Sequence, residues 1–220
     1  MKLITSISGR STQTFSPDDV RGERQPYLPQ VVEHFLGRYN FIDLPNLKDA
    51  GSQGIKFGRG RLERGNESIA IEHLDVFNDG IVAICSNTAD ADIVLDDAIN
   101  WSIETLAMRR PRVMSPRTYT SWIVVDFDEP IASVVSKFIN VQSLIQRSFE
   151  DAYGQQHPFD LLRIGFNVDP RLVPQYTNTE YSIDRRGGAS YAENRFFCAA
   201  PLKNEQHIAY LEKLEQILIK

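Results

Sequence analysis

Apolar and polar positions alternate over residues 55–86, and turn residues interrupt the alternation at two places, which predicts a β-meander. The interruptions are Gly65-Asn66 and Asp79-Gly80. The second is the stronger signal, because both central positions of a type I′ turn need positive φ, which Asp and Gly tolerate. As a two-residue loop, it predicts that Phe77 lies opposite Val82 on the next strand.

Four other segments repeat apolar residues at helical spacing. They predict helices over residues 29–37, 88–110, 130–153 and 205–218. We expect the third of these to cover the sheet with its apolar side, as is usual for an amphipathic helix. The residues on that side are Ile131, Val134, Val135, Phe138, Val141, Ile145 and Phe149.

A second hairpin pattern, residues 181–184 and 194–198, flanks Gly187-Gly188, and single strand patterns cover residues 119–128 and 161–168. Strands and helices therefore come in blocks and do not alternate strictly, which favours an α+β fold over a doubly wound parallel sheet. We predict a mainly antiparallel sheet that is built from two β-hairpin or meander blocks and covered by three amphipathic helices.

Residues 1–28 carry a helix-cap pattern at Ser16-Pro17, but no apolar stripe follows it. We expect this segment to be an N-terminal arm or long loop. Residues 29–220 have the length of a single α+β domain, and a sub-domain split near residues 111–116 is the alternative.

The chain has 220 residues, of which 42% are apolar, so a sizeable core is expected. Its net charge of −5 argues against a general nucleic-acid coat protein, which needs an excess of cations. No apolar run is long enough for a transmembrane helix, and the N-terminus is too polar for a secretory signal. Cys85 and Cys198 lie far apart, which is typical of a reduced, soluble cytoplasmic chain.

A first candidate site is rich in carboxylates. Strand periodicity puts Asp126 and Asp128 on one face of their strand, and it puts His73 and Asp75 on one face of another. If these strands were neighbours, the four side chains could hold a hard divalent metal for hydrolysis. We favour the structural interpretation, in which Asp126 and Asp128 enter a helix N-terminus, so neither a metal nor a catalytic residue is assigned.

A second candidate site is basic. Arg59, Arg61 and Lys56 alternate with glycines, and Arg185-Arg186 precede Gly187-Gly188 on the second hairpin. Arginine beside glycine lets a backbone approach a phosphate, so these residues are candidates for binding nucleic acid or phosphate. Phosphate-loop and dinucleotide motifs are absent, and solvated hairpin turns explain the same pattern.

Motifs for nucleophilic or zinc chemistry are also absent. Both cysteines lie in apolar strand segments, where structural thiols are found. The serines show no nucleophile elbow, and no paired His or Cys motif indicates a zinc site.

We therefore expect a non-catalytic protein–protein interaction or assembly subunit of an intracellular complex, without a cofactor. The acidic balance suits a protein partner with a basic surface, and the amphipathic last helix also fits a homo-oligomer. Two alternatives stay open. One is nucleic-acid or nucleotide-phosphate binding through the Arg/Gly hairpins, and the other is a metal-dependent hydrolase or nuclease that uses the His/Asp cluster. No membrane partner is expected.

Overall fold

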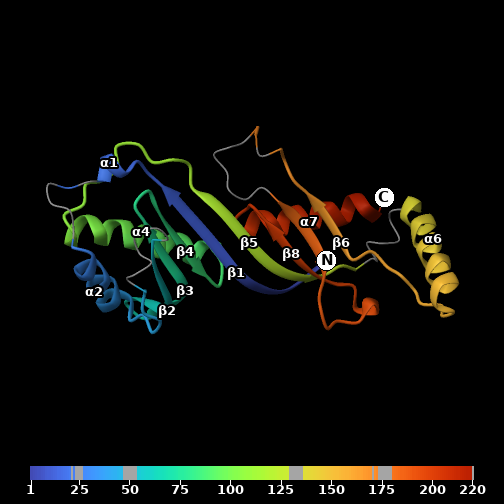
Figure 1. The fold of residues 1–220 in the computed structure, drawn as a ribbon. Coiled ribbons are helices and arrows are strands. Elements are labelled where there is room, and N and C mark those ends of the chain that lie inside the picture. The colour runs from blue at the N-terminus through green and yellow to red at the C-terminus, as the bar shows by residue number, and fades with distance from the viewer. Residues whose placement is uncertain are drawn as a thin grey trace. The chain divides into compact units, whose positions relative to one another are not determined.

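The computed structural model of the chain describes residues 1–20, 22, 27–46, 54–128, 136–169, 171–172 and 180–219 (Figure 1). It confirms the α+β class and the mainly antiparallel sheet. Among the described residues there are five α-helices where we expected three to cover the sheet. Helix α2 corresponds to the helix predicted over residues 29–37, and the short helix α1 was not predicted.

Eight strands form the sheet: β1 (Lys2–Thr14), β2 (Ile55–Arg64), β3 (Glu67–Phe77), β4 (Gly80–Cys85), β5 (Thr118–Asp126), β6 (Arg163–Phe166), β7 (Tyr181–Arg185) and β8 (Arg195–Ala200). The helices are α1 (Pro17–Val20), α2 (Leu28–Tyr39), α4 (Thr88–Thr105), α6 (Ser136–Tyr153) and α7 (Asn204–Ile219), with a 3-10 turn over Tyr191–Glu193. No helix of the described chain is long and apolar enough to cross a membrane.

The strands hydrogen-bond in the order β2-β3-β4-β1-β5-β8-β7-β6. The chain divides into two compact units. We call Ser6–Ser121 with Pro201–Asn204 the N-terminal unit, and Trp122–Ala200 with Met1–Thr5 and Glu205–Lys220 the C-terminal unit. The assignment of residues 29–220 to a single domain stays a prediction.

In the N-terminal unit, strand register decides which side chains face the core. Phe57, Leu74, Ala83 and Ser11 are successive partners across β2, β3, β4 and β1, and all four are buried. Because side chains alternate along a strand, the rungs on either side of this one point to the opposite face. The core cluster on the buried face also contains Phe35 and Tyr39 of α2 and Val94 and Leu95 of α4.

Helix α4 begins with a polar cap. The side chain of Asn87 accepts a hydrogen bond from the backbone N–H of Asp90 at 2.9 Å, which satisfies one of the free donors of the first turn. Asn87 is therefore the capping residue. The helix ends at Thr105, before Arg109 and Arg110, because the backbone at Ala107 turns to a positive φ of 53°.

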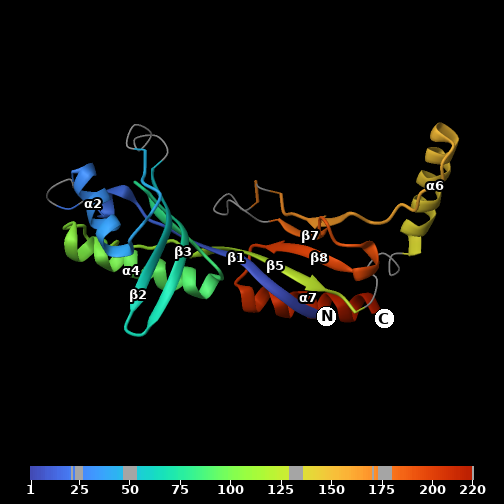
Figure 2. The ribbon, with the colours of Figure 1, turned by 90° about the horizontal axis from the view of Figure 1, so that it is seen from below.

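The C-terminal unit has its own core. Ile164 on β6 lies opposite Ile183 on β7, which lies opposite Cys198 on β8. This rung belongs to a cluster that includes Leu211 of α7. Figures 1 and 2 both show α7 running alongside β5 and β8, so this helix covers the inner face of its strands.

Two local expectations differ from the structure. Lys2–Thr14 form strand β1 between β4 and β5, so this part of the chain is not an arm. The strand was not predicted, because Ser, Gly and Gln as well as apolar residues carry its alternation. The β3–β4 turn is Asn78-Asp79, with Phe77 opposite Gly80, so the expected register was wrong by two residues. A shift of two keeps every side chain on its face.

Candidate functional site

Helix α6 has an exposed apolar stripe. Val141, Leu144 and Ile145 keep 47%, 65% and 43% of their surfaces exposed. The expectation that Val141 and Ile145 face the sheet is therefore wrong. Ile131, Val134 and Val135 lie outside the described residues, and the side chain of Phe138 does too. Exposed aliphatic side chains in a row on one helix are typical of a protein contact surface.

The other side of α6 is anchored. Phe149 contacts Tyr153, His157 and Phe159, with ring centroids 4.7, 5.7 and 5.3 Å away. Gln142 donates a hydrogen bond to Asp160 at 3.2 Å. The helix thus uses one side to pack against residues 157–160 and leaves the stripe with Leu144 to the solvent.

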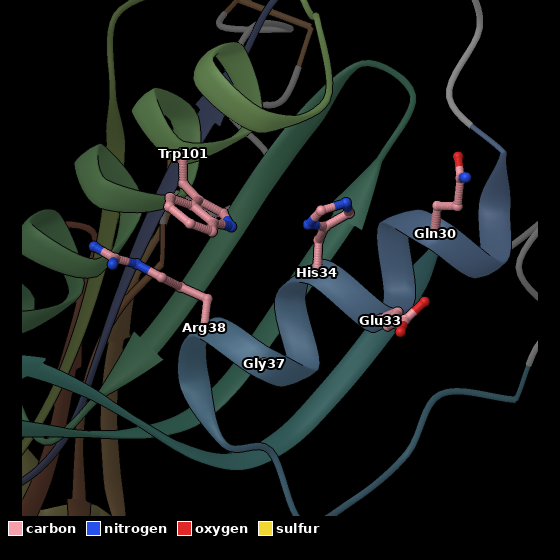
Figure 3. A pocket seen from close by; sticks show the side chains of 6 residues that line it. All are labelled: Gln30, Glu33, His34, Gly37, Arg38 and Trp101. Atoms are coloured by element: carbon pink, nitrogen blue, oxygen red, sulfur yellow. The ribbon is translucent and has the colours of Figure 1, made fainter.

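A hollow of about 580 Å³ lies between α2 and α4 in the N-terminal unit. Figure 3 shows Trp101 of α4 and His34 of α2 extending into the same space, with Arg38 beside the indole. The other lining residues, Gln30, Glu33 and Gly37, come from α2 as well. The hollow is open to solvent.

One wall of this hollow is held by hydrogen bonds and a cation–π contact. Arg38 donates two hydrogen bonds to Asp97, at 2.6 and 3.1 Å, and its guanidinium lies 4.6 Å from the centre of the Trp101 ring. The hydroxyl of Tyr39 also donates to Asp97, and burial raises the pKa of that hydroxyl. The indole N–H of Trp101 is buried without an acceptor, an arrangement that costs about 1–3 kcal/mol.

His73 and Asp75 share one face of the sheet in the N-terminal unit, on the rungs next to the buried one. Lys56 lies directly opposite Asp75, and Arg10 follows His73 on the same rung, beyond Ile84. Burial raises the pKa of Asp75, although the charges of His73, Lys56 and Arg10 act in the opposite direction. The strand register therefore brings His73 and Asp75 of the carboxylate-rich candidate site to the same face as Lys56 of the basic candidate site.

Asp126 and Asp128 have cationic partners in the C-terminal unit. Asp126 accepts hydrogen bonds from Arg195 at 2.8 and 3.2 Å, and Asp128 accepts one from the Met1 amino group at 2.5 Å. Strands β4 and β1 lie between β3 and β5 in the sheet order, so the strands with the four candidate ligands are not neighbours. Over the described ranges, no three His, Cys, Asp or Glu side chains are grouped to hold a metal.

Most of the hairpin arginines are engaged. Arg59, at a positive φ of 51°, binds Asp43 through two hydrogen bonds, and Arg61 pairs with Glu63 at 3.3 Å. Arg185 is almost fully buried against Asp160, whereas Arg186 is exposed. Arg59 and Arg61 lie on β2 and Arg185 ends β7, and these two strands are not neighbours in the sheet order.

Both thiols are unsuited to nucleophilic chemistry. Cys85 and Cys198 are free and buried, and burial raises their pKa values, to about 12 for Cys85. Such a thiol stays protonated at neutral pH, when only the thiolate would react.

Sequence reasoning missed Arg10, the hollow beside Trp101 and the exposure of Leu144. Arg10 could have been found only with the strand register, because β1 was not predicted as a strand. The sequence matches no known protein-family model, and the search of curated proteins found no similar sequence.

Proposed function

We propose that this protein is a non-catalytic assembly subunit that associates with protein through α6. The observation that carries the proposal is the exposure of Val141, Leu144 and Ile145 on a helix whose other side is already packed. Burying such side chains is worth about 25 cal/mol per Å² of apolar surface, and the helix is in place before the partner arrives.

The anchoring of α6 supports a docking role. Phe149 and Gln142 hold the helix to residues 157–160, and Asp160 is in turn bound by the buried Arg185 at 2.6 Å. Arg185 also lies over the rings of Tyr191 and Phe196. A helix that is already folded and held by these contacts loses less conformational entropy on binding than a segment that folds on its partner.

The test is the mass of the particle that contains the protein in native extract, compared for the wild type and Leu144→Asp. We expect the wild type in a particle heavier than one 25.0 kDa chain and the variant at the mass of one chain. A buried aspartate at a contact centre costs several kcal/mol, enough to dissociate a micromolar complex.

Leu162→Asp is the matched control, because Leu162 is 63% exposed and lies outside α6. It should leave the particle unchanged. If Leu144→Asp leaves the particle at its wild-type mass while circular dichroism shows a folded protein, α6 is not the docking element.

Binding of a phosphate or another small anion is a second candidate, favoured by Arg10 and Lys56. Among the described residues, neither cation has an ion-pair partner, and Nε of Arg10 is buried without a hydrogen-bond acceptor. Calorimetry with inorganic phosphate and with a mononucleotide should show binding that weakens in high salt and in Arg10→Gln with Lys56→Gln. Equal heats for wild type and double variant would exclude this site.

We infer a cytoplasmic location. It is supported by two cysteines that are both free and buried, as is usual where thiols are kept reduced.

A further inference from the structure

We propose that the partner of α6 is α6 of a second copy of this chain, packed antiparallel about a two-fold axis near Leu144. This inference rests on the proposed docking role of α6. It adds the identity of the occupant and the register of the contact.

The helix face centred on Leu144 is self-complementary in its spacing. Positions 137, 141, 144, 148 and 151 are separated by four, three, four and three residues, so they lie on one side of the helix. Leu144 is at the centre of the set, seven residues from Lys137 and seven from Asp151. A two-fold axis at Leu144 therefore brings position 137 of one copy to Asp151 of the other.

The charges of α6 also favour an antiparallel copy. The first turn has no acidic residue, the last turn has no basic residue, and Glu150 and Asp151 lie close to the C-terminus. This polarity is opposed to the helix dipole, which prefers acids at the N-terminus and bases at the C-terminus. An antiparallel neighbour places its positive N-terminus, with Lys137, beside these acids.

The centre of the proposed contact suits close packing. Leu144 meets Leu144 at the axis, with Ile145 and Val141 beside it, and Val141 lies toward the partner's Ser148. Ser148 is small, so it leaves room for the opposing aliphatic side chain. Its hydroxyl already donates to the carbonyl of Leu144 at 2.9 Å, so no hydrogen bond is lost when the stripe is covered.

The first measurement is light scattering on the purified full chain across a concentration series. We expect the wild type and Leu162→Asp to approach about twice 25.0 kDa and Leu144→Asp to stay at the mass of one chain. A wild type that remains at one chain up to about 100 μM would overturn the second copy as occupant. If α6-dependent particles still form in extract, the docking role survives that failure.

A charge exchange tests the orientation. Lys137→Glu alone and Asp151→Lys alone should each weaken self-association by about 3- to 30-fold, because each places two like-charge contacts in the dimer. The double variant restores the opposite charges and should return to within about threefold of the wild type. Failure of the double variant to recover, with wild-type helical content, would overturn the antiparallel register. Ser143→Lys changes charge off the stripe and should have no effect.

Discussion

Helices α4 and α6 have the same length, 18 residues, but their apolar side chains differ in burial. Leu95 of α4 is completely buried, as are its neighbours in the core cluster, whereas Leu144 of α6 is 65% exposed. Both segments have apolar residues at helical spacing. The comparison teaches that an amphipathic pattern shows that a helix needs a partner, without showing whether the same chain supplies it.

The surroundings of α4 explain its burial. Its apolar side packs against the sheet, Asp97 binds Arg38 of α2, and Asp92 and Asp96 bind Arg117 at 2.9 and 2.6 Å. Contacts of these three kinds hold most of α4 against the rest of its unit. Helix α6 is packed on one side only, and Val141, Leu144 and Ile145 remain exposed.

The largest expected effect separates the two helices directly. Leu95→Ala should lower the free energy of unfolding by about 3–5 kcal/mol, because it removes a fully buried side chain and leaves a cavity. Leu144→Ala should change it by less than about 0.5 kcal/mol in dilute protein. Urea denaturation measures both, and equal losses would show that α6 is packed within the chain.

A second prediction extends the comparison to α7, another packed helix. His207 of α7 is buried, and burial lowers its pKa to about 4. Between pH about 6.5 and about 4, the unfolded chain binds a proton at His207 that the folded chain does not bind. The stability that neutral His207 contributes is therefore complete above pH about 6.5 and is lost as the pH falls toward 4. The loss attributable to this group is about 3 kcal/mol.

Urea denaturation at a series of pH values checks this slope. His207→Leu should flatten it between pH 6.5 and 4.5, where ordinary carboxylates contribute little. Ile217 of α7 is exposed and has no titratable group, and Ile217→Ala should keep the wild-type slope. The same slope in His207→Leu and the wild type would assign the proton uptake to another group.

A third prediction concerns the polar side of α4. Burial alone would raise the pKa of Asp92, but hydrogen bonds from Ser11, Arg117 and Lys203 outweigh it and hold the pKa low. Asp92→Asn should therefore cost about 2 kcal/mol of unfolding free energy. Asp96→Asn breaks one exposed pair and should cost less than about 1 kcal/mol. A reversed order in thermal or urea unfolding would contradict this assignment.

The smallest expected effect is at the start of α4. Asn87→Ala removes the side-chain acceptor for the N–H of Asp90 and should cost about 1 kcal/mol. Asn87→Ser keeps an acceptor and should recover most of the loss in the same urea titration. Equal losses in the two variants would mean that the cap contributes through something other than this hydrogen bond.

Local patterns predicted a large part of the fold. The meander over residues 55–86, the hairpin around Gly187-Gly188 and the C-terminal end of α6 before Gly154 are present where turn and helix signals indicated them. Strand β1 was missed because its inward residues include Ser11, Gln13 and Gly9, which do not read as an apolar face. Gly9 is there because an added side chain would meet the backbone of Asn87 and Thr88.

By itself, the sequence determined which residues share a face, because strand and helix periods are local properties of the backbone. His73 and Asp75 are on one face of β3, and positions 137, 144 and 151 are on one side of α6, whatever surrounds them. Only the tertiary structure decided what each face meets. Lys56 lies opposite Asp75, Arg195 binds Asp126 and Leu144 meets solvent because strand order and helix packing depend on contacts between distant parts of the chain, which no local pattern encodes.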